Sequence, residues 1–213
     1  MVNRLRPVLQ EVISPNQSAF IPGRLITDNA LIAFECVHAI QKGQSERTNF
    51  CAYKLDMSKA YDRADWNFME GIMARLGFHE QWIRWVMVCA TSVRYAVKFN
   101  GNMLRSFTPS RGLRQGDPLS PYLFILCAEG LSAMLQKAEA EEKIKGFCIC
   151  RGAPRVNHLF FVDDSLILMQ SRYNDAFELR RILSIYERVS GQVINKDKSS
   201  ILFSPNSGTQ VKG

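Results

Sequence analysis

The sequence predicts an α+β fold with an antiparallel sheet, and three observations support this prediction. Helical and strand patterns are mixed along the chain without the β–α–β–α rhythm of a doubly wound fold. Residues 93–107 alternate around Asn100-Gly101, which is a strong sequence signal for a β-hairpin. Residues 159–169, LFFVDDSLILM, are mostly large and apolar but carry two acids at their centre, and they predict a second hairpin.

The first half of the chain contains the following expected elements. Residues 28–42 place apolar side chains at helical spacing, with Asp28 as the N-cap. Residues 49–62, NFCAYKLDMSKAYD, begin as a short apolar strand and end in polar residues. Two more helices are expected, an amphipathic one over 64–78 and another in the stretch EQWIRWVMVCATS, residues 80–92.

The second half adds two long helices and a last strand. Residues 118–142 predict a long helix that is opened by prolines in its first turn. Another helix is expected from about Asn174 to Val189, and Gly191 ends it. A short strand spans about 199–203.

Composition narrows the class of protein. The net charge of +7 favours polyanionic partners such as nucleic acid or an anionic membrane. No apolar run reaches the roughly 18 residues of a membrane span, and the N-terminus lacks a secretory signal. The six cysteines include no CxxC pair, so free, buried thiols in a reducing compartment are expected rather than a zinc site. We therefore expect an intracellular protein, without a choice between nucleus and cytoplasm and without a predicted oligomeric state.

Asp163 and Asp164 lie in the most apolar run of the chain. One straight buried strand would force one of the two carboxylates into the core, where an ionised group is strongly unfavourable. We therefore expect two short strands, about 156–162 and 165–169, with Asp163, Asp164 and Ser165 in the turn between them. For this stretch alone, an ordinary surface turn with two acids is the favoured interpretation.

A third acid, Asp56, ends an apolar strand in the same way. If the two strand ends are neighbours, three carboxylates meet, and they repel one another unless a divalent cation neutralises them. Hard oxygen ligands of this kind select Mg²⁺ or Mn²⁺, and two such ions can hold an attacking hydroxyl and a leaving phosphate oxygen. In isolation, a helix N-cap explains Asp56 about as well.

Several ordered motifs resemble reverse transcriptases, above all the plant-type non-LTR (LINE-like) retrotransposon enzymes. The motifs run through almost the whole chain and are the opening blocks at 3–38, Asp56, PSRGLRQGDPLSPYLF at 109–124, FVDD at 161–164 and a block at 186–204. The resemblance implies a right-hand polymerase with fingers and palm, in which helices pack on an antiparallel palm sheet. Its expected divisions are fingers at roughly 1–50 and 79–112, palm at roughly 51–78 and 113–204, a flexible tail at 205–213, and no thumb.

The resemblance also implies an activity, namely RNA-directed DNA polymerisation. The enzyme would join deoxynucleotides to a DNA primer 3′-OH on an RNA template, using two Mg²⁺ ions for which Mn²⁺ can substitute, and no membrane would be involved. Asp56, Asp163 and Asp164 would be catalytic and would hold the metal ions. Lys198 would protonate the departing pyrophosphate, and Tyr61 would exclude a ribose 2′-OH. The other expected nucleotide-binding residues are Gln115, Gly116, Arg111, Arg114 and Arg24.

Alternative interpretations remain for these assignments. Lys198 and the arginines can equally be ordinary surface charges, and Tyr61 can be a buried ring on a helix. The corresponding tetrad of the family commonly reads Phe-Ala-Asp-Asp or Tyr-x-Asp-Asp, whereas this chain has Val162 at the second position. A β-branched residue there suits a strand. The endonuclease and thumb of LINE-like proteins are expected to be missing, so a catalytically silent retrotransposon remnant, which binds nucleic acid weakly or only folds, is the alternative function. A third candidate, an RNA-directed RNA polymerase, is disfavoured by Tyr61 at the gate position.

Overall fold

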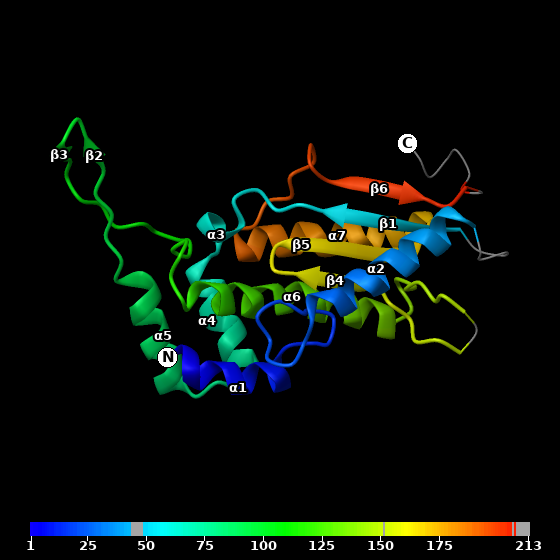
Figure 1. Ribbon diagram of the computed structural model, residues 1–213, viewed down its shortest axis with the longest axis horizontal. Helices are drawn as coiled ribbons and strands as arrows, with labels where there is room; N and C mark the ends of the chain where they lie inside the picture. The colour runs from blue at the N-terminus through cyan, green and yellow to red at the C-terminus, as the bar shows by residue number, and fades with distance from the viewer. Residues whose placement is uncertain (44–48, 151, 206, 208–213) are drawn as a thin grey trace.

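A four-stranded antiparallel sheet forms the centre of the molecule (Figure 1). The computed structural model describes residues 1–43, 49–150, 152–205 and 207, so most of the tail expected at 205–213 lies outside the described residues. The strand order is β4-β5-β1-β6, and each neighbouring pair is antiparallel, which confirms the expected fold class. The strands are β1 (Phe50–Leu55), β4 (His158–Phe161), β5 (Asp164–Gln170) and β6 (Ser200–Phe203).

The expected helices and the first hairpin are present. A short ribbon of β2 (Lys98–Phe99) and β3 (Asn102–Met103) turns at Asn100-Gly101. The helices are α1 (Val2–Val12), α2 (Ile26–Gln41), α3 (Ala60–Arg63), α4 (Trp66–Arg75), α5 (Glu80–Thr91), α6 (Ser120–Ala140) and α7 (Tyr173–Ser190).

One predicted helix start is wrong. Leu25 is the N-cap of α2, so Asp28 lies in the first turn of the helix instead of capping it. A carboxylate in the first turn still interacts favourably with the positive end of the helix dipole. Asp28 therefore correctly indicates the N-terminal end of α2, although it lies three residues after the N-cap.

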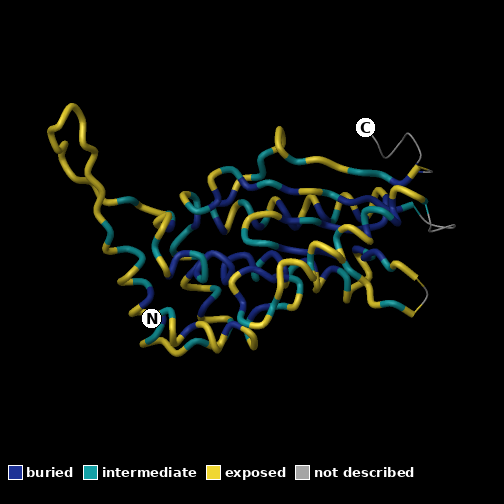
Figure 2. Tube along the Cα trace, viewed as in Figure 1, coloured by how far each residue is buried: buried dark blue, intermediate teal, exposed yellow. Residues whose placement is uncertain are grey.

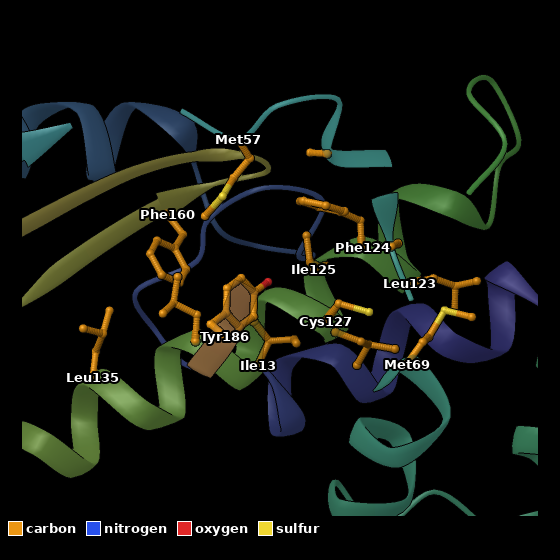
Figure 3. Close-up of a cluster of buried hydrophobic side chains, with 14 of the residues drawn as sticks. Ile13, Met57, Met69, Leu123, Phe124, Ile125, Cys127, Leu135, Phe160 and Tyr186 are labelled. Atoms are coloured by element: carbon orange, nitrogen blue, oxygen red, sulfur yellow. The ribbon is translucent and has the colours of Figure 1, made fainter. Parts of the chain in front are cut away.

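Side chains alternate between the two faces of the sheet. One face carries Cys51, Leu55 and Ile167 into the main hydrophobic core, which Phe160, Leu123 and Tyr186 also line (Figure 3). Helix α6 runs through this core and is buried on most sides, as its nearly continuous apolar sequence requires. The opposite face places Phe50, Ala52 and Leu168 against Cys36, Ala39 and Ile40 of α2 in a second, smaller core.

The cysteines are free thiols, as expected, but they are not all buried. Cys36, Cys51 and Cys127 are buried, whereas Cys89 and Cys150 are exposed. Burial raises the pKa of the Cys127 thiol to about 12, with a smaller contribution from Asp65. Only the exposed thiols are therefore placed to react with reagents in solution.

A buried polar network joins α6 to β4. The Ser132 hydroxyl oxygen lies 2.9 Å from Nε2 of His158, and Nδ1 of His158 lies 2.6 Å from Oδ1 of Asn157. Because an amide oxygen only accepts, Nδ1 carries the ring proton and Nε2 accepts from Ser132. The Ser14 hydroxyl extends the network at 2.8 Å from that of Ser132. Ser132 and His158 are wholly buried, so this Ser–His–Asn arrangement stabilises the fold and is not a hydrolytic site.

His158 is expected to make stability depend on pH. Burial lowers its pKa to about 3, so the folded protein keeps the ring neutral while the unfolded chain protonates near pH 6.5. The stabilisation is thus complete above about pH 6.5, and the free energy of unfolding should fall by roughly 1.4 kcal/mol per pH unit below it. Urea denaturation at several pH values measures this slope. His158→Gln cannot take up the proton, and an identical slope in this variant would show that His158 is not its source.

Candidate active site

The three acids lie at one end of the sheet, where β1 ends and β5 begins (Figure 1, at the left end of these strands). The last β1–β5 pair is Leu55 with Ser165. Asp56 directly follows Leu55, and Asp164 directly precedes Ser165, so these two acids continue the same register on neighbouring strands. Residues directly opposite in an antiparallel pair have Cα atoms about 4.5–5.5 Å apart. Asp164 is on the face of the sheet that carries Lys54, opposite the main core, and Asp56 directly follows the end of the adjacent strand β1.

The hairpin that carries the paired acids differs from its prediction. The turn consists of Val162 and Asp163 alone, because Asp164 already pairs with Phe161 as the first residue of β5. The expected turn at 163–165 and the expected strand position of Val162 are both wrong. Val162 has a φ of 56°, a left-handed conformation that is rare for a β-branched residue and typically costs about 1–3 kcal/mol. This turn exposes Asp163 at the tip of the hairpin.

Tyr61 belongs to α3 and packs against α6. Its ring stacks on that of Phe124 in α6, with centroids 5.0 Å apart and planes 10° from parallel. Burial raises the pKa of the Tyr61 phenol, and the negative charge of Asp163 raises it further. An aromatic ring with one apolar face fixed against α6 is thus held within electrostatic range of the Asp163 carboxylate.

The loop after α7 holds the backbone of Asp56 in place. The carbonyl oxygen of Asp56 accepts from the Asn195 N–H at 2.8 Å, and its own N–H donates to the Ser199 hydroxyl at 3.1 Å. Two residues on, the Ser58 N–H donates to the Val193 carbonyl at 2.8 Å. Sequence reasoning missed these positioning residues, and their only sequence signal is the polar GQVINKDKSS stretch that includes Lys198.

Lys198 belongs to the same loop. Its N–H donates to Oδ1 of Asn195 at 3.3 Å, and its side chain is exposed. The loop therefore places Lys198 in the turn that is bonded to Asp56, at the same end of the sheet as the acids.

The loop at 109–116 packs against α3. The Leu113 N–H donates to the Tyr61 carbonyl at 2.8 Å, and the Gly112 carbonyl accepts from the indole N–H of Trp66 at 2.8 Å. Gly112 has a φ of 94°, and a Cβ there would lie 2.7 Å from the Asp62 carbonyl oxygen. The glycine therefore lets the backbone of α3 approach the loop closely. The loop leaves the following predicted residues exposed: Arg111, Arg114, Gln115 and Gly116.

Arg24 contacts the loop after α1. Its guanidinium donates to the backbone carbonyls of Ile13, Ser14 and Gln17, and so braces the loop after α1. Burial lowers its pKa, while the charge of Glu129 opposes this shift. Both terminal nitrogens of Arg24 thus stabilise this loop, and its expected role in nucleotide binding stays a prediction.

The three acids do not form a ready-made metal cluster. Across the described parts of the chain, no group of three or more His, Cys, Asp or Glu side chains is arranged to hold a metal ion. The donor chemistry nevertheless fits hard divalent ions, because Asp163 and Asp164 are exposed and Asp56 is half-buried on the adjacent strand.

The face near Asp164 is open to a ligand. A cavity of about 470 Å³ lies between α2 and the sheet, and Lys54, Asp164 and Ser165 are among its lining residues. Its remaining walls are mostly apolar and include Ala30 and Ala33 of α2. The small side chains of α2 thus keep space free beside one of the acids.

Comparison with known proteins agrees with this geometry. A family model described as reverse transcriptase (RNA-dependent DNA polymerase) matches residues 1–211. The chain is 30% identical over 200 residues to the transposon TX1 uncharacterized 149 kDa protein of Xenopus laevis, covering 94% of this chain and 15% of that protein. It is 27% identical over 185 residues to the Pol polyprotein of the type-2 retrotransposable element R2DM of Drosophila melanogaster, covering 86% of this chain and 16% of the polyprotein. The chain thus spans about a sixth of the length of these two relatives.

A solved structure shows the same fold. Telomerase of Candida tropicalis, in complex with a TWJ fragment of telomeric RNA, matches with a TM-score of 0.67 at 13% identity, over 97% of this chain and 34% of that one. This likeness confirms the expected right-hand polymerase fold. In the described residues, no helix is both long and apolar enough to cross a membrane. Membership of the matched family implies dependence on a divalent metal ion. By the match of its whole described length, the chain belongs to the reverse transcriptase (RNA-dependent DNA polymerase) family.

Proposed function

We propose that this chain is the polymerising part of an RNA-directed DNA polymerase, which joins deoxynucleotides to a DNA primer 3′-OH on an RNA template. The observation that carries the proposal is the position of all three acids at one end of the sheet: Asp56 directly follows β1, Asp164 begins the adjacent β5, and Asp163 lies in the turn before it. In this proposal, residues 1–50 and 79–112 form the fingers, and residues 51–78 and 113–204 form the palm.

Asp56, Asp163 and Asp164 would hold two Mg²⁺ ions, or Mn²⁺ in their place. Bound there, such ions neutralise charge on the attacking and leaving oxygens of a phosphoryl transfer. The open face beside Asp164 leaves room for the primer terminus. Hydrogen bonds to its backbone N–H and carbonyl hold Asp56 in place at the end of β1.

The remaining site residues would position the incoming nucleotide. Arg111 and Arg114 are exposed on a loop bonded to α3, and guanidinium groups bind phosphates bidentately. Gln115 and Gly116 follow on the same loop and would pack against the incoming nucleotide and the template strand. Lys198 would donate a proton to the leaving pyrophosphate from the loop bonded to Asp56.

Tyr61 would exclude the 2′-OH of ribonucleotides, and this role gives a direct test. Purified chain with Mg²⁺ and a primed RNA template should extend the primer with deoxynucleotides and discriminate against ribonucleotides. Tyr61→Ala should reduce this discrimination by about 10- to 100-fold, because the ring that clashes with the 2′-OH is gone.

Tyr61→Phe is the matched control, since it keeps the ring stacked on Phe124 and should keep the discrimination. Single-nucleotide incorporation rates with each triphosphate give the ratio. No extension at any protein concentration would contradict the proposed polymerase, and unchanged discrimination in Tyr61→Ala would contradict the gate.

A further inference from the structure

A β-hairpin arm, residues 94–108, projects from the body of the molecule (Figures 1 and 2, upper left). Every one of its residues is exposed. Its ribbon is held by reciprocal bonds between Tyr95 and Phe107, at 2.9 and 2.8 Å, and by the turn at Asn100-Gly101, where both φ angles are positive. An isolated two-stranded hairpin is at best marginally stable in water, so a partner that covers the arm would stabilise it.

Apolar side chains that would be buried in a packed hairpin face solvent here. Phe99 is 63% exposed, and the Tyr95 and Phe107 rings lie together, with centroids 5.9 Å apart. Val97, Met103 and Leu104 are exposed beside them. Large apolar residues gathered on one exposed element indicate a binding surface.

The charge of this region identifies the kind of partner. Between Gln81 and Gly116 the chain has no Asp or Glu and carries six basic residues, against a net charge of +7 for the whole protein. These six residues are Arg84, Arg94, Lys98, Arg105, Arg111 and Arg114. A second copy of this chain would present the same positive charge and be repelled, whereas a polyanion would be attracted.

We propose that the arm binds single-stranded nucleic acid, with its aromatic rings stacked on bases and its basic side chains on phosphates. Interleaved rings and cations are the combination that such surfaces use without reading sequence. The arm leads directly into the 109–116 loop, which is bonded to α3 and Tyr61. A strand on the arm would therefore reach the site as the uncopied part of the template, and this placement rests on the proposed polymerase function.

Binding to the arm can be measured apart from catalysis. Fluorescence anisotropy with a labelled, unstructured oligoribonucleotide, without Mg²⁺ or nucleotides, gives the affinity of the full chain at several salt concentrations. Phe99→Ala should weaken binding about tenfold or more and leave the salt dependence unchanged, because a stacked base is lost but no phosphate contact is. Phe177→Ala is its matched control, since Phe177 is similarly exposed, at 61%, but lies on α7, and it should bind as the wild type does.

A charge variant tests the phosphate contacts. Arg94→Gln, Lys98→Gln and Arg105→Gln combined should reduce the slope of log affinity against log salt by about 2, as three lost contacts to a single strand would. The matched control combines Arg75→Gln, Arg180→Gln and Arg188→Gln, which removes as many exposed charges from α4 and α7. Circular dichroism checks that each variant stays folded.

Several results would overturn the proposal. They are absence of RNA binding by the wild type at low salt, equal binding by both arm variants and their controls, or a preference for duplex over single strand. If the arm variants keep RNA binding but lose self-association in sedimentation, the partner of the arm is a second copy of the chain. If they keep RNA binding but lose binding to anionic phosphatidylserine vesicles, the partner is a membrane. Asp163→Asn should bind RNA normally, so failure of the polymerase site and failure of the arm are distinguishable.

Discussion

Asp163→Asn should reduce primer extension by about a thousandfold or more, because the substitution removes the charge that a divalent ion needs and leaves the side-chain shape unchanged. Asp163 is exposed at the tip of the β4–β5 turn, so the variant should fold like the wild type. Extension of a labelled primer on an RNA template, with Mg²⁺, measures the loss. Asp56→Asn should show a loss of similar size.

The chain offers a matched control for this prediction in Asp62. It is exposed in α3 directly after Tyr61, and it is not among the proposed metal ligands. Asp62→Asn removes the same charge and should keep extension within about twofold of the wild type, since screened surface charges have small effects. Equal extension by wild type and Asp163→Asn would refute metal-assisted catalysis at this site.

Gly112→Ala should destabilise the fold by about 3 kcal/mol, a large effect for a single added methyl group. Two costs combine in this variant. Alanine is strained at a φ of 94°, and its Cβ would lie 2.7 Å from the Asp62 carbonyl oxygen, which belongs to backbone that cannot rotate away. Because relief requires the 109–116 loop to move off α3, primer extension should fall as well.

Gly77→Ala separates the two costs. Gly77 has a φ of 84°, but a Cβ there would meet no atom within 4 Å, so only the backbone strain remains. We expect a loss of about 1 kcal/mol in this variant, measured by urea denaturation beside Gly112→Ala. If the free energy of unfolding fell equally in the two variants, the close contact between the methyl group added at position 112 and α3 would add no destabilisation beyond backbone strain.

Local patterns predicted most of the fold, and the errors have a common cause. The hairpin at Asn100-Gly101 was predicted correctly because both turn residues favour positive φ. The turn beside the acids was misplaced because polar residues normally form turns, whereas here Val162 adopts the left-handed conformation and Asp164 enters the strand. Tertiary contacts override local preference at this point, and the Val162 N–H lies 3.4 Å from Oε1 of the buried Gln17.

The site could be predicted from sequence only in part. Asp56, Asp163 and Asp164 stand out as acids at the ends of apolar strands, and the structure places them at one end of the sheet. Asp56 is held by the Asn195 N–H and the Ser199 hydroxyl, and the sequence does not show that these two groups in a polar loop bond to it. The contacts of Arg24 could not be predicted either, since its partners are backbone carbonyl groups whose positions depend on the fold.

The most direct test of the central claim is a crystal structure of the chain with Mn²⁺ and a non-hydrolysable deoxynucleoside triphosphate. The anomalous signal of Mn²⁺ locates the ion without reference to the protein. Our account predicts one ion in contact with the carboxylates of both Asp56 and Asp163, at the end of the sheet where β1 meets β5. Ions bound elsewhere, or carboxylates of Asp56 and Asp163 that turn away from each other and share no ion, would contradict it.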